Sequence, residues 1–106
     1  MTYDPEPTVL LYAADGWSVD ARISRHSGKL HFYGQDLGGP FSEYEWSWSF
    51  APETFADIRT ALADRDRTRD LLVVVQEFFT DTDIRDPGKW LRDNGIPAEF
   101  WSRFEH

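Results

Sequence analysis

One segment of this chain alternates large aromatic side chains with small or acidic ones, and it limits the possible folds more than any other. Residues 44–50 read Tyr-Glu-Trp-Ser-Trp-Ser-Phe, so the rings belong to Tyr44, Trp46, Trp48 and Phe50. A period of two is the period of a β-strand, which points all these rings to one face of a sheet. Such a face either fills the core of a small domain or forms a large contact surface. The core is favoured, because the rest of the chain needs an apolar sheet face on which to pack.

The length predicts one domain, spanning residues 1–106. A domain of this size buries roughly two-thirds of its unfolded surface and needs no covalent staples. The chain contains no cysteine, which excludes a disulfide framework and a thiolate zinc site. No segment approaches the ~20 apolar residues of a membrane span, and the first residues lack the basic and apolar regions of a signal peptide. We therefore expect a soluble, cytoplasmic protein.

The first half of the chain alternates in the manner of strands joined by short turns. The first two connections contain Asp-Gly and Ser-Gly pairs, which favour turns. The pattern predicts a four-stranded antiparallel meander. Its strands should cover residues 9–13, 17–24, 29–36 and 43–50.

The second half carries apolar residues at helical spacing. Pro52 and Glu53 suit the first turn of a helix that should end near Asp64. The run Leu-Leu-Val-Val-Val at 71–75 is ambiguous, because consecutive valines favour a strand. The apolar residues of 71–79 nevertheless share one helical face, so we favour a helix over about 67–80.

Two shorter helices should follow. Thr82 or Asp83 can cap a helix near 86–94, with Gly95 as its C-terminal stop. A last short helix should begin at residues 96–97 and carry Phe100, Trp101 and Phe104. We therefore predict an α+β domain in which about three helices from the C-terminal half pack on one face of the meander.

The net charge of the chain limits the classes of partner that it can bind. The net charge is −8, and residues 1–50 and 51–106 share it equally, with 3 basic and 7 acidic side chains in the first part and 8 and 12 in the second. A uniformly acidic surface repels nucleic acid and anionic membranes and attracts basic proteins. It also keeps a small protein in solution without any partner.

Several groups of residues are candidates for a chemical site. Glu43 and Glu45 share a strand face at roughly 7 Å, a spacing that glycosidase carboxylates use but that any exposed strand can show. Residues 81–86 begin like a calcium loop, yet Arg85 stands where a ligand is needed. His26 and His31 flank a hairpin without an evident third metal ligand, and His106 is terminal. Residues 34–40 are glycine-rich but link two strands, so they have no helix dipole for phosphate. We expect no catalytic residue, no metal and no cofactor.

If the aromatic residues form the core, the opposite sheet face is polar. That face should dock a basic protein surface or remain an ordinary solvated face. Its members should be Asp20, Arg22, His31, Tyr33, Gln35, Glu43 and Glu45.

The chain resembles the immunity proteins of bacterial polymorphic-toxin and contact-dependent-inhibition systems. The resemblance covers the whole chain in size, acidity and α+β layout, with local similarity at residues 34–38, 43–46 and 95–101. It implies a non-enzymatic inhibitor that covers the active site of a basic toxin domain, often a nuclease. An acidic surface is steered rapidly to such a partner. The candidate contact residues are Asp20, Tyr33, Asp36, Glu43 and Glu45 on the sheet, and Asp81, Asp83 and Asp86 on a loop.

Other functions stay open at this point. The chain could be an adaptor or self-associating protein that uses exposed aromatic side chains, as a monomer or a homodimer. It could also bind a small ligand in a tryptophan-lined pocket, or hydrolyse a substrate with Glu43 and Glu45.

Overall fold

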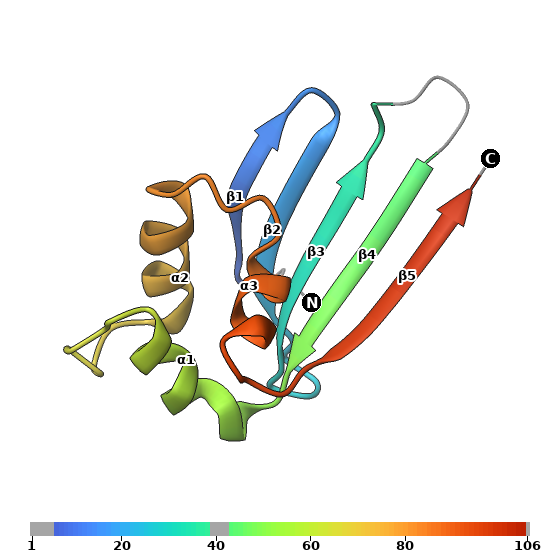
Figure 1. The fold of residues 1–106 in the computed structure, drawn as a ribbon. Coiled ribbons are helices and arrows are strands. Elements are labelled where there is room, and N and C mark those ends of the chain that lie inside the picture. Colours follow the sequence, from blue (N-terminus) through green and yellow to red (C-terminus); the bar gives the residue numbers. More distant parts are fainter. Residues whose placement is uncertain (1–5, 39–42, 106) are drawn as a thin grey trace, which may run out of the picture.

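The protein is an antiparallel sheet with helices on one of its faces (Figure 1). The computed structural model describes residues 6–38 and 43–105. The strands are ordered β1-β2-β3-β4-β5, so each pairs with its neighbour in the chain. They are β1 (Thr8–Ala14), β2 (Trp17–Ile23), β3 (Leu30–Asp36), β4 (Glu43–Phe50) and β5 (Glu99–Glu105). Between β4 and β5 lie the 3₁₀ turn η1 (Pro52–Thr54) and the helices α1 (Phe55–Ala61), α2 (Leu71–Thr80) and α3 (Pro87–Asp93).

The α+β fold, the four-stranded meander and the three helices on one face are confirmed. The Asp-Gly turn forms the tight connection between β1 and β2, where Asp15 and Gly16 both have positive φ, 54° and 83°. Leu37 donates its backbone N–H to the Gly16 carbonyl at 2.8 Å, which holds this turn against the end of β3.

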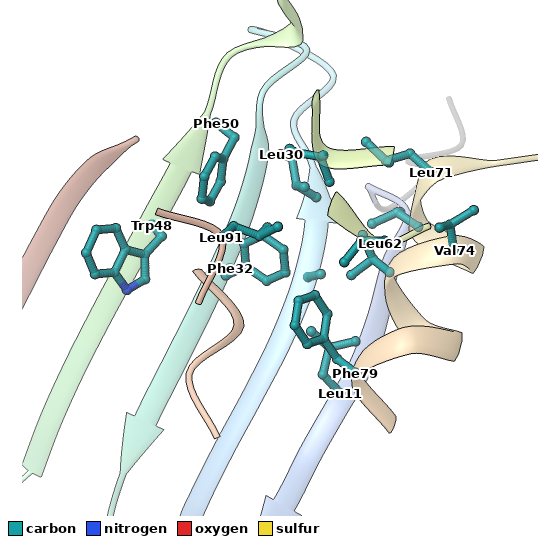
Figure 2. Packing of buried hydrophobic residues seen from close by; sticks show 14 of the residues in the cluster. Leu11, Leu30, Phe32, Trp48, Phe50, Leu62, Leu71, Val74, Phe79 and Leu91 are labelled. Carbon is teal, nitrogen blue, oxygen red and sulfur yellow. The ribbon is translucent and has the colours of Figure 1, made fainter. Parts of the chain in front are cut away.

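The aromatic strand lies in the core (Figure 2). Trp46, Trp48 and Phe50 expose 2%, 8% and 0% of their surface, and Tyr44 is half-buried. Phe32 on β3 meets Phe50 edge-on and Phe79 of α2 in the same way, with centroids 5.7 and 6.0 Å apart. Of the two alternatives for the aromatic face, the structure therefore shows the core.

The run of valines is helical, as favoured, although α2 begins at Leu71 and not near 67. Asp70 caps it by accepting the backbone N–H of Leu72 at 2.9 Å. The helix buries Leu71, Leu72, Val74, Val75 and Phe79. Packing of that face against the sheet outweighs the strand preference of valine.

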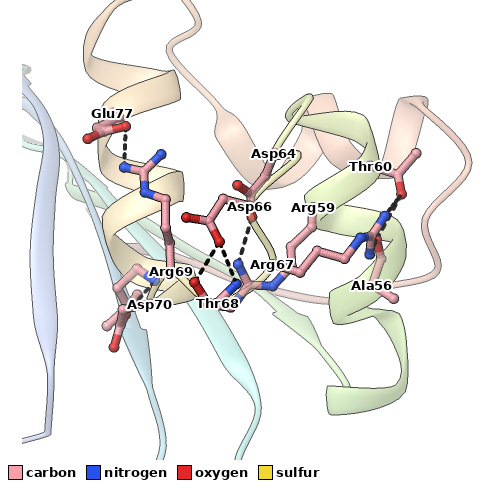
Figure 3. Close-up of polar contacts among 11 residues, drawn as sticks. Ala56, Arg59, Thr60, Asp64, Asp66, Arg67, Thr68, Arg69, Asp70 and Glu77 are labelled. Carbon is pink, nitrogen blue, oxygen red and sulfur yellow. Dashed lines mark hydrogen bonds and ion pairs between the residues drawn. The ribbon is translucent and has the colours of Figure 1, made fainter.

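The charged residues 64–70, which connect α1 to α2, are held by ion pairs and hydrogen bonds (Figure 3). Arg59 of α1 donates to the buried Asp64 carboxylate at 2.8 Å, and the two side chains expose only 16% and 2%. Arg67 reaches back to the Thr60 hydroxyl, and Arg69 pairs with Glu77 of α2. These bonds fix the connection between the two helices and explain why α2 starts later than predicted.

The predicted final helix is wrong, because residues 99–105 form β5. Phe100 and Phe104 pair in register with Trp48 and Tyr44, on the side of the helices, and Trp101 pairs with Ser47 on the other side. The alternation of these side chains has the period of a strand. Strand β4 offers an unpaired edge, and filling its hydrogen bonds favours extension over a short helix.

The third helix ends as predicted, but its cap differs. Gly95 follows α3 with φ 91°, and its N–H bonds to the Arg92 carbonyl at 2.9 Å. Neither Thr82 nor Asp83 caps the helix. Asp86 does, because Pro87 occupies the first turn and the Asp86 carboxylate accepts the Lys89 N–H at 3.2 Å.

Across residues 6–38 and 43–105, no helix has both the length and the apolar character needed to cross a bilayer.

Candidate protein-binding surface

The face of the sheet away from the helices is polar and carries two large aromatic side chains. We call it the open sheet face and define it by the outward-pointing residues of β2 to β5. The strand register places Asp20, Tyr33, Ser47 and Trp101 in one row across all these strands. The whole set is Ser18, Asp20, Arg22, His31, Tyr33, Gln35, Glu43, Glu45, Ser47, Ser49, Glu99, Trp101 and Arg103.

Arg22 contacts both the β2 and the β3 members of this row, Asp20 and Tyr33. Its guanidinium lies 3.3 Å from the Asp20 carboxylate and 5.7 Å from the centre of the Tyr33 ring. Burial raises the pKa of the Tyr33 phenol above its ordinary value, and the neighbouring Glu45 carboxylate raises it further. Glu45 in turn accepts a hydrogen bond from Gln35 at 3.3 Å. These contacts hold the side chains in place before any partner arrives.

His31 lies next to this row and contacts Ser49, with 2.8 Å between Nδ1 and the hydroxyl oxygen. Burial lowers the pKa of the imidazole, and the cations Lys29 and Arg22 act in the same direction against Glu6 and Glu99. A histidine–serine contact is one part of an acyl-transfer site, which also needs free N–H donors for the oxyanion. Ser49 lies inside the ladders that join β4 to β3 and β5, so its neighbouring backbone groups are engaged. The contact fixes the orientation of the His31 imidazole on the open sheet face.

A shallow depression of about 260 Å³ opens on the same face. It lies between the end of β2 and the start of the described chain, and both a cation and a carboxylate border it. Its lining comprises Glu6, Arg22, Ser24, His31, Tyr33 and Ser47.

The structure brings together half of the predicted contact residues. Asp20, Tyr33, Glu43 and Glu45 share the open sheet face. Asp36 does not, although we placed it there, because it pairs with Trp17 and Tyr44 on the helix side. Positions 33 and 36 are an odd number of residues apart, so a strand points them to opposite faces.

The three acidic residues of the predicted loop lie between α2 and α3, on the helix side of the sheet (Figure 1). Asp81 and Asp83 are exposed, whereas Asp86 is half-buried. Burial raises the pKa of Asp86, opposed by the Lys89 N–H and by the nearby indoles of Trp46 and Trp48. Asp86 is therefore a structural cap, and the loop cannot form one surface with the open sheet face.

The space beside the core tryptophans is filled. A Cβ atom on Gly34 would lie 2.1 Å from the Trp46 ring, and one on Gly88 would lie 2.4 Å from Trp48. The rings thus pack directly on the backbone of β3 and α3. This packing supports a structural role for Trp46 and Trp48 over a role as the walls of a ligand pocket.

Trp101 is a surface residue that was not predicted, because a helix was expected over residues 96–104 where the structure has β5. Trp101 exposes 49% of its surface at the centre of β5. The signal was the alternation of Phe100, Ser102 and Phe104 with Trp101 and Arg103.

Within the part of the chain that the structure describes, His, Asp and Glu side chains nowhere gather in threes as a metal ion would require. His106 lies outside that part. Comparison of the chain with protein-family models, curated proteins and solved structures gave no match.

Proposed function

We propose that this chain is a non-enzymatic protein-binding module whose open sheet face binds a basic protein, as an immunity-type inhibitor binds a toxin domain. The observation that carries the proposal is the pairing of aromatic and acidic side chains on the uncovered face. Tyr33 and Trp101 lie in one row with Asp20, Glu45 lies in the next row, and Glu43 lies one row further along the same face.

The aromatic side chains supply contact area. Tyrosine and tryptophan bury a large surface while losing few rotatable bonds, which makes them common anchors in interfaces. Trp101 is half exposed, and the Arg22 guanidinium lies over the Tyr33 ring. Because these side chains stand on hydrogen-bonded strands, binding would order little backbone and lose little affinity to that ordering.

The acidic groups provide electrostatic steering of a basic partner toward this face. Carboxylates outnumber guanidinium groups on the open sheet face, and the chain as a whole carries −8. A basic partner such as a nuclease domain would be steered to this face, with an association rate that falls as salt rises. An inhibitor of this class acts in the cytoplasm of the cell that it protects.

The test compares two double variants. Each loses two negative charges, one variant from the open sheet face and the other from the loop on the helix side. Asp20→Asn/Glu43→Gln removes two charges from the open sheet face, and Asp81→Asn/Asp83→Asn removes two from the loop after α2. Tagged wild type and both variants are used to capture partners from native cells at low salt, and bound proteins are identified by mass spectrometry.

We expect one basic protein to bind the wild type and the loop variant, to be lost with the sheet variant and to be released by high salt. Cells that express the captured protein should recover growth with the wild type and not with the sheet variant. Equal capture by both variants would contradict the assignment to the open sheet face. Recovery of the protein alone would contradict the inhibitor function.

A further inference from the structure

The two edges of the sheet differ in how they are protected. At the β1 edge, α2 packs beside the strand, and Gln76 donates its side-chain amide to the Leu10 carbonyl at 3.4 Å. The register of β1 also shifts between Leu10 and Tyr12, which forms a bulge. A bulge and a covering helix are two common means by which proteins prevent an edge strand from pairing.

Within residues 6–38 and 43–105, the β5 edge shows neither form of protection. It is the last strand in the sheet order, and the helices lie over the part of the sheet nearer to β1 (Figure 1). The strand runs without a register shift against β4 and contains neither proline nor lysine. Its outer edge is thus regular and open to pairing with another strand.

This edge also carries three exposed aromatic side chains. Phe100, Trp101 and Phe104 expose 50%, 49% and 55% of their surface. The Phe100 ring packs tilted against Trp48 with centroids 4.4 Å apart, and the ring centroids of Phe104 and Tyr44 are 6.1 Å apart, so each phenylalanine extends the aromatic row of β4 outward. An apolar row that runs to an open edge marks an interaction surface.

The sequence of β5 is nearly symmetric about its centre. It reads Glu-Phe-Trp-Ser-Arg-Phe-Glu, with Ser102 in the middle. Antiparallel pairing with the same strand about a two-fold axis at Ser102 sets Phe100 opposite Phe104 of the second copy and Trp101 opposite its Arg103. Aromatic pairs and a cation beside an indole are favourable cross-strand neighbours.

We infer that this chain forms a two-fold symmetric homodimer in which β5 pairs antiparallel with β5 of a second copy. The same patch meets itself, so the interface closes and no open fibre results. The phenylalanines of both copies meet on the helix side, and the open sheet faces join into one continuous surface.

Charge opposes this dimer, and the opposition is measurable. Each copy carries −8, so the two copies repel each other, and Glu99 adds a negative charge beside the interface. Lys29 lies 3.0 Å from Glu99 and offsets part of that repulsion. Because salt screens repulsion between like-charged copies, the dimer should strengthen as salt is added. Binding of a basic partner should weaken under the same change, so the two proposals can fail separately.

The first test is a cross-link. The chain has no cysteine, so a single Ser102→Cys substitution gives one thiol. A disulfide needs Cβ atoms roughly 3.5–4.5 Å apart, and directly opposed strand residues place them roughly 4.5–5.5 Å apart, so a small shift allows the bond. Mild oxidation should convert Ser102→Cys to a covalent dimer far faster than Ser27→Cys, whose thiol would lie in the exposed turn after β2. Equal rates for the two variants would overturn the proposed register.

The second test is the mass of the purified protein across concentration and salt, measured by sedimentation. The wild type, 12.4 kDa as a monomer, should approach twice that mass, and more readily at high salt. Ser102→Lys sets two ammonium groups together on the axis and should weaken the dimer at least about tenfold, whereas Ser27→Lys should not. Equal urea unfolding of the variants will show that they fold. A wild type that stays monomeric up to about 1 mM, or that forms open aggregates, would overturn the dimer.

Discussion

The Trp46 indole lies across the backbone of Gly34, its direct partner on the neighbouring strand. A Cβ atom on Gly34 would sit 2.1 Å from the ring, and the ring exposes only 2% of its surface. The ring also contacts Trp17 and Tyr44, with centroids 4.5 and 5.5 Å away. It therefore cannot move aside without disturbing other aromatic side chains.

Gly34→Ala should lower the free energy of unfolding by about 1–3 kcal/mol, because it overfills a packed core. The measurement is urea unfolding followed by tryptophan fluorescence. The double variant Gly34→Ala/Trp46→Leu should lose less than the sum of the single variants, since the smaller side chain leaves room for the methyl group. Additive losses would show that the contact with Trp46 does not limit position 34.

The ion pair between Arg59 and Asp64 should stabilise the connection between α1 and α2. Arg59→Ala leaves the Asp64 carboxylate, 2% exposed, without its cation. We expect a loss of about 3 kcal/mol in the free energy of unfolding. The matched control is Arg65→Ala, at an exposed position of the same connection, which should change it by less than about 0.5 kcal/mol. Similar losses for the two variants would mean that the buried ion pair contributes no more to the free energy of unfolding than an exposed arginine does.

Stability should fall on acidification because of His31. Burial first, then nearby cations, holds the pKa of folded His31 below its ordinary 6.5, so the unfolded chain binds a proton more readily. The contribution of neutral His31 is complete above 6.5 and is lost as pH falls from there toward the folded pKa. His31→Gln should flatten the decline in unfolding free energy between about pH 8 and about pH 5. An unchanged decline would assign it to other groups.

Asp86 should act in folding and not in partner binding. Asp86→Ala removes the cap of α3 and should cost about 1 kcal/mol of unfolding free energy. Asp86→Asn keeps a capping oxygen and should cost less, because burial already raises the pKa of Asp86 and disfavours its charged form. Urea unfolding at neutral pH measures both variants. Capture of the basic partner should survive in Asp86→Asn, and its loss there would place Asp86 in the interface.

Sequence patterns predicted the meander and the buried aromatic strand because period-two alternation is a local property. The cap of α3 and the fifth strand of the sheet were harder to predict from the sequence, since both depend on residues far away in the chain. Asp86 caps the helix beside Trp46 and Trp48, and β5 is a strand because β4 had an edge left to pair. Asp36 lies on the helix side and not beside Tyr33, because the odd spacing between the two residues points them to opposite faces of β3.

The sequence by itself determined the α+β class, the core strand, the helical nature of α2 and the polar character of the opposite face, because periodicity and composition encode them. Only the tertiary structure decided that residues 99–105 complete the sheet, that Trp101 joins the row of Tyr33, and that one edge stays open. Strand pairing joins residues far apart in the chain through backbone groups that every sequence shares. No local pattern therefore specifies which edge receives the last strand.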